Sequence, residues 1–533
     1  MLNLCKRGIE IAKPQCYFLN QKTFSILLLF LFLQPTFGQS LRLSEVNDFY
    51  PKDFQSFNTT DSTTVYLFSF SKGDVENGKQ NHSIIMLDQN LDKVLEIDLQ
   101  LRRKEYVVET VFDGVNIFTK TLSVKKSLFY YKQFNLLGTL TYEDERSANY
   151  REINSYINKH GKQHNYKSVH SITGMGFVEY LSSEDLEEYS VRFLPNSLST
   201  IKPWVYKGNN DAKKQICQYI DFNNGLIISQ VKKRRKKNVL VKSLQCLRIE
   251  DGTLTLEVGL SHPEKEIYPR RIEVGKDGIE LIGTYEYKKN HHQGICRWHI
   301  SLDGEVDCME YYNLYQALEF DIANSSIESN LLQEENIFYL HDFHKQSNGD
   351  ILVIGEQHFI YVNEGRAAMN LINVASIISM VNGGPGYLVF INPFKIGVGD
   401  LVAFQFDASI NLKKAYAFPK PGKIIELKHL DSPTISSIGL GLSRGGFFDF
   451  AFSNSLGECF YSIEMKDIDD DVCDFLGVIS NDTNLVSSQT IEILDQPFGE
   501  LVKVLPTKMS SKVLLLYYYE LAQLLTAKFQ ETY

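Results

Sequence analysis

Paired short hairpins constrain the fold of this chain more than any other feature. Short apolar runs alternate with turn residues, as in residues 107–118, where Asp113-Gly114 separates two apolar segments. Asp-Gly and Asn-Gly favour two-residue hairpin turns because both turn residues must tolerate positive φ. The same turn chemistry recurs at Asn224-Gly225, Asp251-Gly252, Asp277-Gly278, Asp303-Gly304 and Asn348-Gly349. This pattern predicts an all-β chain of short antiparallel strands.

The hairpins come in pairs, four of which (those that begin at Asp113, Gly174, Asn224 and Asp277) have similar spacing, and two consecutive hairpins form a four-stranded meander. The pairs are Asp113 with Asn135–Gly138, Gly174 with Pro195, Asn224 with Asp251, Asp277 with Asp303, Thr59–Asp61 with Gln89–Asn90, Asn348 with Asp407–Ser409, Gly445 with Gly457, and Lys508 with Glu520. Repetition of such a unit is typical of a β-propeller. We therefore expect a β-propeller of seven or eight four-stranded blades, in which the first unit completes the last. Tandem β-sandwiches are the alternative, since they also combine short strands with regular turns.

The N-terminal segment has the layout of a secretory signal peptide. Four basic residues precede the apolar run Phe24–Leu33, and a short exit follows that ends at Gly38. A run of ten residues falls short of the roughly 20 that a spanning helix needs, although an anchor retained in the membrane remains an alternative. The prediction is a signal peptide over 1–38 and a single propeller domain over 39–533, without a transmembrane span in the mature chain. The expected location is the periplasm, the outer membrane surface or the cell exterior.

Composition narrows the possible partners. The net charge of −10 argues against a nucleic-acid binder, which normally shows a basic footprint. Six cysteines follow the leader, and an exported chain permits disulfides. Cys296 and Cys308 flank one hairpin and are the first candidates for a disulfide, with buried free thiols as the alternative.

One region resembles a known family. Residues 349–357 read Gly-Asp-Ile-Leu-Val-Ile-Gly-Glu-Gln, and a hairpin follows with Gly-Asp-Leu-Val at 399–402, Asp407 and a Lys-rich stretch that ends in Pro-Lys at 419–420. This combination resembles a family of uncharacterised exported proteins of Bacteroidota, whose members look propeller-like. Phe418 stands where that family has an aliphatic residue, and a hydrophobic insert separates the two elements. The resemblance implies a secreted repeat protein of a Gram-negative envelope and implies no activity.

Glu356, Gln357 and His358 are the candidate ligand-binding residues. They end a strongly apolar run, and polar groups at the end of an inner strand could face the central channel of a propeller. The competing interpretation is structural: these side chains satisfy backbone groups between neighbouring blades.

Four other motifs each have a plain structural explanation. The basic run Lys232–Lys237 could bind an acidic partner but reads as a solvated hairpin tip. The acidic run Asp467–Asp474 lacks the spacing of an EF-hand loop, and the histidine groups (His291, His292 and His299; His341 and His344) lack a third ligand at defined spacing. Ser443 sits in a G-x-S-x-G match that no predicted helix follows, so a nucleophile elbow is not expected. No metal site and no cofactor are expected.

These observations favour a non-enzymatic binding or scaffold module of the bacterial cell envelope. An acidic, Trp-poor surface suits a protein or peptide partner more than a sugar. A secreted hydrolase of glycans or peptides, with its site in the central channel, is the alternative. A calcium-stabilised adhesin is a weaker one.

Overall fold

Strands make up nearly all the regular structure of the chain. The computed structural model describes residues 40–531 except for 60–62, 158–166, 209–213, 235–239, 288–292, 315–336, 347, 363–393, 419–422, 427–441, 443–447, 449, 457–458, 465–471, 480–485, 493–499 and 508–511. The helices within these limits are α2 (Tyr150–Tyr156) and the 3₁₀ turns η1 (Pro51–Asp53) and η7 (Glu520–Ala522). None of the described helices has the length and apolarity to cross a bilayer. The leader predicted over 1–38 lies outside the described residues.

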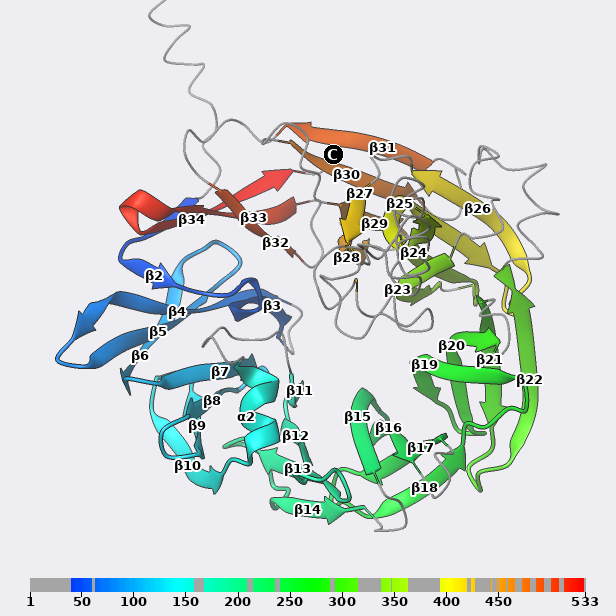
Figure 1. Cartoon of the computed structure of the whole chain (residues 1–533), viewed down its shortest axis with the longest axis horizontal. Helices are drawn as coiled ribbons and strands as arrows, with labels where there is room; N and C mark the ends of the chain where they lie inside the picture. The colour runs from blue at the N-terminus through cyan, green and yellow to red at the C-terminus, as the bar shows by residue number, and fades with distance from the viewer. Residues whose placement is uncertain are drawn as a thin grey trace, which may run out of the picture.

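The described strands form eight antiparallel sheets that follow one another around a ring (Figure 1). Six sheets have four strands and two have a fifth. Most sheets are meanders whose first strand lies nearest the centre of the ring (Figure 1). The predicted β-propeller of seven or eight four-stranded blades is confirmed, and the alternative of tandem β-sandwiches is wrong.

We number the blades in chain order. Blade 1 contains β2 (Val46–Asp48), β3 (Phe54–Asn58), β4 (Thr64–Glu76), β5 (Lys79–Leu87) and β6 (Lys93–Arg102). Blade 2 contains β7 (Glu105–Phe112), β8 (Asn116–Ser123), β9 (Leu128–Asn135) and β10 (Leu140–Ser147). Blade 3 contains β11 (Val169–Ile172), β12 (Gly176–Ser182), β13 (Tyr189–Pro195) and β14 (Trp204–Lys207), and blade 4 contains β15 (Lys214–Asn223), β16 (Leu226–Arg234), β17 (Leu240–Arg248) and β18 (Leu254–Gly259).

Blades 5 to 8 complete the ring. Blade 5 contains β19 (Lys265–Val274), β20 (Ile279–Tyr287), β21 (Gln293–Ile300) and β22 (Val306–Asn313). Blade 6 contains β23 (Ile337–Lys345), β24 (Ile351–Val362), β25 (Phe394–Phe406), β26 (Leu412–Phe418) and β27 (Lys423–Glu426). Blade 7 contains β28 (Phe450–Leu456), β29 (Cys459–Glu464), β30 (Val472–Ile479) and β31 (Val486–Glu492), and blade 8 contains β32 (Glu500–Pro506), β33 (Lys512–Tyr519), β34 (Leu524–Glu531) and β1 (Ser40–Leu43).

The two ends of the chain meet in blade 8. β1 pairs with β34 in antiparallel register, Ser40 opposite Lys528 and Leu43 opposite Leu525. The N-terminal strand thus forms the outer edge of a sheet whose other strands come from the C-terminus. The expectation that the first unit completes the last is confirmed.

The predicted turns join the strands as expected. Asp113-Gly114 connects β7 to β8, and Asn224-Gly225 connects β15 to β16 with φ of +47° and +75°. Sequence reasoning missed one turn of the same chemistry, Asn77-Gly78 between β4 and β5, where φ is +50° and +73°. Gly445 and Gly457 lie outside the described residues; β28 and β29 pair in antiparallel register, with Leu456 opposite Cys459.

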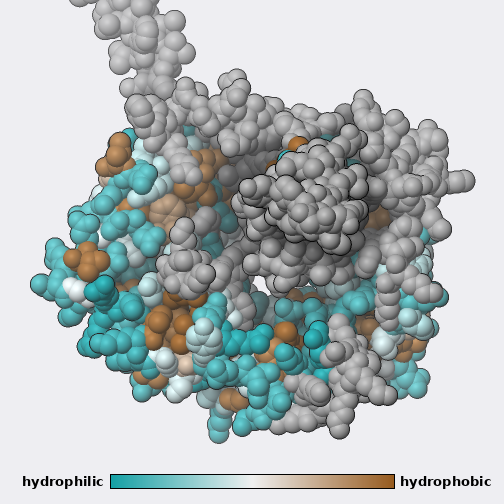
Figure 2. All heavy atoms as spheres, in the orientation of Figure 1, coloured by the Kyte–Doolittle hydropathy of each residue, from teal (hydrophilic) through white to brown (hydrophobic). Residues whose placement is uncertain are grey.

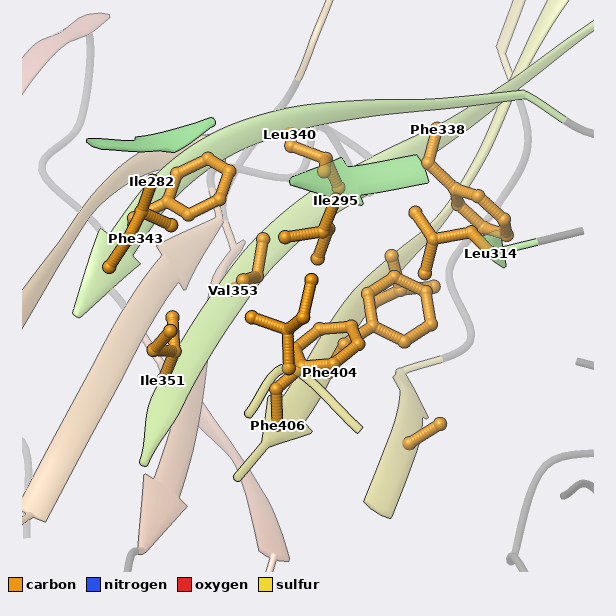
Figure 3. Close-up of a cluster of buried hydrophobic side chains, with 13 residues drawn as sticks. Ile282, Ile295, Leu314, Phe338, Leu340, Phe343, Ile351, Val353, Phe404 and Phe406 are labelled. Carbon is orange, nitrogen blue, oxygen red and sulfur yellow. The ribbon is translucent and has the colours of Figure 1, made fainter. Parts of the chain in front are cut away.

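The hydrophobic core is divided among the interfaces between neighbouring blades. One cluster joins Ile282 and Ile295 of blade 5 to Phe338, Val353 and Phe404 of blade 6 (Figure 3). A corresponding cluster packs blade 8 against blade 1 and therefore closes the ring. On the face shown in Figure 2, hydrophilic residues cover most of the described surface, and hydrophobic residues form only small groups.

A buried charge network lies between blades 2 and 3. Lys120 of β8 pairs with Glu179 of β12 at 2.7 Å, and both side chains are at most 1% exposed. Arg192 of β13 contacts the second oxygen of Glu179 at 2.8 Å. Glu109 of β7 accepts the backbone N–H groups of Ser168 and Val169 at 3.0 and 2.9 Å. These contacts supply the partners that charged groups need when they are removed from water.

Candidate functional site

The first strand of most blades carries a β-bulge. Seven of these strands have one residue without a partner in the ladder. In the six outside blade 1 this residue is Val108, Ile220, Arg270, His341, Ala451 or Val502. A bulge bends its strand and re-aims the side chains around it. Among those six strands, the residue after the bulge is charged in five: Glu109, Asp221, Arg271, Asp342 and Lys503. The bulges therefore place charged side chains in the innermost layer of the propeller.

Three consecutive bulges line one polar cavity. Its volume is about 610 Å³, and its walls are β15, β19 and β23, which neighbour one another around the centre of the ring (Figure 1). The bulge residues Ile220, Arg270 and His341 all contribute to its lining. A concave site of this size with a few convergent polar groups is typical of small-molecule and peptide pockets.

Most charges around the cavity neutralise one another. Glu273 pairs with Arg271 at 3.0 Å and with Lys345 at 2.5 Å, and Lys345 also contacts Glu280 at 3.3 Å. Burial works against ionisation of Glu273, but the two cations hold the pKa of its carboxyl below its usual range. Arg271 also donates to the backbone oxygen of Phe343 at 3.4 Å. The side chains of Arg271, Glu273 and Lys345 therefore leave few hydrogen-bonding positions open for a ligand.

Arg270 differs from its neighbours. Its side chain is exposed and makes no ion pair with any described residue, and its guanidinium lies 5.6 Å from the centre of the Tyr339 ring. Asp221 lines the same cavity, and burial raises the pKa of its carboxyl above the usual range, although Arg271 opposes the shift. Among the described residues, the cavity thus offers the Arg270 guanidinium without an ion-pair partner, together with the Asp221 carboxyl, whose pKa burial raises.

A serine, a histidine and an aspartate meet at the edge of the cavity. Ser453 of β28 places its Oγ 2.6 Å from Nε2 of His344 and donates to Oδ2 of Asp342 at 2.7 Å. Nε2 of His344 also lies 3.5 Å from the same carboxylate oxygen. Burial lowers the pKa of His344, although Asp342 opposes the shift, so the imidazole is neutral near pH 7.

The predicted ligand-binding residues lie beside this cavity rather than in its lining. Glu356, Gln357 and His358 belong to β24, the second strand of blade 6, and are buried. The expected position at the end of an inner strand is therefore wrong, because the apolar run continues as a longer strand through these polar residues. Glu356 accepts the backbone N–H of Phe450 in blade 7 at 3.2 Å, and Gln357 accepts that of Asp400 at 3.4 Å. Direct ligand contact by these residues stays a prediction.

An aromatic cluster separates β24 from the cavity. The His341 ring stacks on Phe450 with centroids 4.4 Å apart, and its Nε2 lies 3.2 Å from Glu356. Phe448 stacks on Tyr339 at 5.1 Å. Nδ1 of His358 is buried without a hydrogen-bond partner among the described residues, and burial lowers the pKa of its ring to about 4. The predicted triplet thus connects to the cavity through His341.

The other sequence candidates fall largely outside the described residues. Lys232–Arg234 end β16, where Lys233 is buried and contacts Glu257 at 3.4 Å; the rest of the basic run is outside. His291, His292, Ser443 and residues 467–471 are also outside. No group of three metal-ligating residues occurs within the described part of the chain.

The predicted disulfide is absent. Cys296 and Cys308 are both free, Cys296 buried opposite Tyr311 and Cys308 exposed opposite His299. Their side chains occupy different positions along the β21–β22 ladder, so the two sulfurs cannot meet. Cys217 and Cys246 are also buried free thiols, and burial raises the pKa of Cys246 to about 12.

Sequence reasoning missed the residues that line the cavity. The signal lay in the first strand of each hairpin pair, where the alternation of apolar and polar residues breaks. Pro269-Arg270-Arg271 and Leu340-His341-Asp342 place adjacent polar residues inside such a run. A break in alternation is what a bulge produces, because the extra residue shifts the following side chains to the other face.

The chain is similar to several solved structures at low sequence identity. The propeller domain of the Trilobed protease from Pyrococcus furiosus, described as having an open velcro topology, aligns over 84% of this chain and 97% of its own at 11% identity, with a TM-score of 0.33. A putative 6-phosphogluconolactonase from Bacteroides fragilis covers 74% of this chain and 99% of its own at 12% identity and a TM-score of 0.31. Prolyl oligopeptidase B from Galerina marginata covers 88% and 55% at 8% identity and a TM-score of 0.40.

A family relationship is visible at the level of sequence. No curated protein matches the chain significantly. The model of a family described as of unknown function, DUF6770, matches residues 19–524, which include strands of every blade and end at the start of β34. The chain therefore belongs to the DUF6770 family.

Proposed function

We propose that this protein is an exported ligand-binding propeller of the bacterial cell envelope, and that its ligand places an anionic group against Arg270. The observation that carries this proposal is the charge pattern of the cavity. Arg271, Lys345 and Glu273 satisfy one another, whereas the exposed guanidinium of Arg270 has no described counter-ion. Arginine recognises carboxylate and phosphate groups through paired hydrogen bonds.

The position of Arg270 favours a ligand over a solvated surface role. As the bulge residue of β19, it leaves the ladder and lines the cavity together with Asn223 of β15. The amide of Asn223 adds a donor on the adjacent wall. Asp221, whose carboxyl gains protons readily, supplies a third polar group. A peptide with a free C-terminal carboxylate matches these groups in charge and size.

The binding test uses matched probes. We expect short peptides with a free C-terminus to bind in calorimetric titrations, and their C-terminally amidated forms to bind at least tenfold more weakly. Inorganic phosphate serves as the second anion, so that carboxylate and phosphate recognition are distinguished. Arg270→Gln should weaken binding about 10- to 100-fold, as expected for a charge-assisted contact worth about 1.5–3 kcal/mol.

Arg151 provides the control. It is exposed on α2, far from the cavity in the fold, and Arg151→Gln changes the net charge by the same amount. Equal affinities of the wild type and both variants for every probe would refute the anion site.

Export is supported by the leader-like segment before Gly38 and is tested separately. We expect fractionation of cells that express a C-terminally tagged chain to recover it from the envelope, with a mature N-terminus after residue 38. Crosslinking in the same cells should capture an envelope protein or peptide partner in stoichiometric amount. Recovery of an unprocessed chain in the cytoplasm would contradict the proposal.

A further inference from the structure

A hydroxyl, an imidazole and a carboxylate form a closed triangle at the junction of blades 6 and 7. Ser453 Oγ lies 2.6 Å from His344 Nε2 and 2.7 Å from Asp342 Oδ2, and the latter two atoms are 3.5 Å apart. Asp342 lines the cavity, and Ser453 is partly exposed. These are the distances at which a serine can pass its proton to a neighbouring base.

The fold explains why these three groups meet. The bulge at His341 sets the direction of the residues that follow, and Asp342 and His344 then share one face of β23 because side chains alternate along a strand. β28 is the first strand of the next blade and contacts β23. Ser453 follows the corresponding bulge of β28, so the same irregularity positions both sides of the contact.

We propose that Ser453 is a nucleophile that accepts acyl groups from esters entering the cavity, with His344 as its general base. The other serine hydroxyls that contact histidine in the described structure do not fit this role as well. Ser69, which contacts His82 at 2.8 Å, is buried at 1% exposure. Ser453 combines the imidazole contact with partial exposure and a hydrogen bond to Asp342, which lines the cavity.

The chemistry follows from the geometry. The Ser453 hydroxyl donates to Oδ2 of Asp342 at rest and must turn toward His344 before it reacts. When the imidazole carries its proton on Nδ1, Nε2 then accepts the Ser453 proton while Oγ forms a bond to the carbonyl carbon of the ester. The carbon–oxygen bond to the leaving alcohol then breaks, and the alcohol takes the proton from Nε2. Water releases the acyl group in a second step, with His344 as base and the hydroxyl of Ser453 restored as the leaving group. Neither an oxidant nor a further co-reactant is needed.

Asp342 acts differently from the acid of a Ser-His-Asp triad. Its carboxylate lies next to Nε2 and the serine, whereas the acid of such a triad accepts the proton on Nδ1. Asp342 therefore stabilises the positive charge on the imidazolium and holds Ser453 in place. The positive charge of Arg271 favours the neutral ring that a base requires.

The preferred ester carries an anionic group. This part of the inference rests on the proposed function, because Arg270 would hold that group in the cavity. A monoester of a dicarboxylic acid has the required chemistry: one end is an acyl donor and the other a carboxylate. The reactivity of Ser453 itself does not depend on Arg270.

Labelling by a fluorophosphonate probe tests the nucleophile directly. We expect the folded wild-type chain to form a covalent adduct that peptide mass spectrometry places on Ser453, and Ser453→Ala to lose at least 90% of the label. Ser171→Ala is the matched control: Ser171 lies in the inner strand β11, and no described histidine hydrogen-bonds with its hydroxyl. Absence of an adduct on Ser453 in folded protein would overturn the proposal.

The roles of the other groups need a second readout. With p-nitrophenyl acetate, His344→Gln should lower the acylation rate at least 100-fold at unchanged melting temperature, and Asp342→Asn should lower it less. Arg270→Gln should remove the preference for p-nitrophenyl hemisuccinate over the acetate, whereas Arg151→Gln should change neither this preference nor the labelling. If the wild-type chain is labelled but shows no preference for the hemisuccinate, the anion site is refuted and the nucleophile stands. If the chain binds anionic probes but is not labelled, the nucleophile alone is refuted. A wild-type labelling rate in His344→Gln would refute the base.

Discussion

Lys120 of β8 and Glu179 of β12 form an ion pair of 2.7 Å across two blades, at positions where solvent reaches at most 1% of either side chain. The ammonium of Lys120 also donates to Tyr156 and Ser168, each at 2.9 Å. The pair therefore belongs to a satisfied network, in which loss of one member leaves a charge without its partner in a region of low dielectric constant.

Lys120→Met should destabilise the chain severely. Removing one partner from a buried pair costs about 3–5 kcal/mol, because the remaining carboxylates keep their desolvation penalty. The free energy of unfolding in urea measures this loss. Lys132→Met is the control: the Lys132–Glu143 pair has exposed fractions of 35% and 56%, so its loss should cost less than about 1 kcal/mol. Equal effects of the two substitutions would show that blades 2 and 3 are not joined through Lys120.

Glu356→Ala should lower stability without changing ligand affinity. The substitution leaves the backbone N–H of Phe450 without its acceptor, at a cost of about 1–3 kcal/mol. Glu356→Gln keeps a carbonyl oxygen at the same place and should cost less. The measurement compares melting temperatures with calorimetric affinity for the best peptide probe. Unchanged melting with lost affinity would instead establish Glu356 as a ligand-binding residue.

Asp53 should make stability fall as pH rises from about 4 to 7. Burial raises the pKa of its carboxyl to about 7 in the folded chain, above the value near 3.9 of an unfolded chain. The folded state therefore holds more protons in this window, so its stability is fully present below pH 4 and is lost toward pH 7, by at most about 1.4 kcal/mol per pH unit. The difference in the free energy of unfolding between the wild type and Asp53→Asn, measured at each pH, isolates the effect of Asp53. The titration of His82 is common to both proteins and cancels in this difference. A difference that does not change with pH would contradict the shift.

Gly252→Ala should cost more than Gly225→Ala, although both glycines have positive φ in turns of blade 4. A Cβ on Gly252 would lie 2.4 Å from the Trp204 ring, whereas one on Gly225 would meet only a side-chain oxygen at 3.8 Å. We expect about 1 kcal/mol for the left-handed backbone in both variants and a further 1–3 kcal/mol from overpacking at Gly252. Urea unfolding followed by tryptophan fluorescence measures both. A similar loss of stability in the two variants would show that the Trp204 ring shifts to make room for the added methyl group.

The sequence predicted the fold well because turn chemistry is local. Asp113-Gly114 and Asn224-Gly225 specify tight hairpins regardless of their surroundings, so the meander and its repetition could be inferred from them. Helix α2 was missed, although Asn149 and Glu152 form a capping box at its start. Its seven residues are too few for a periodic pattern to stand out.

The cavity could not be predicted in the same way. Ile220, Arg270 and His341 are separated by 50 or more residues, and they meet only because three blades stack around an axis. Ser453 and His344 likewise come from different blades. The apolar run before Glu356 suggested the end of a strand, whereas the polar residues there contact the next blade. Contacts of this kind depend on tertiary packing, which local patterns do not encode.

The pairing of β1 with β34 has a consequence for the order of folding. Among the described strands, Ser40–Leu43 is synthesised first and its partner, Leu524–Glu531, last. Seven sheets can form in succession while the eighth lacks its outer strand, so the final step joins the two described strands that are farthest apart in sequence. Until then both segments present unpaired backbone groups that could template association with another chain. Because β1 has only four residues, it exposes few unpaired backbone groups while the rest of the chain is being synthesised.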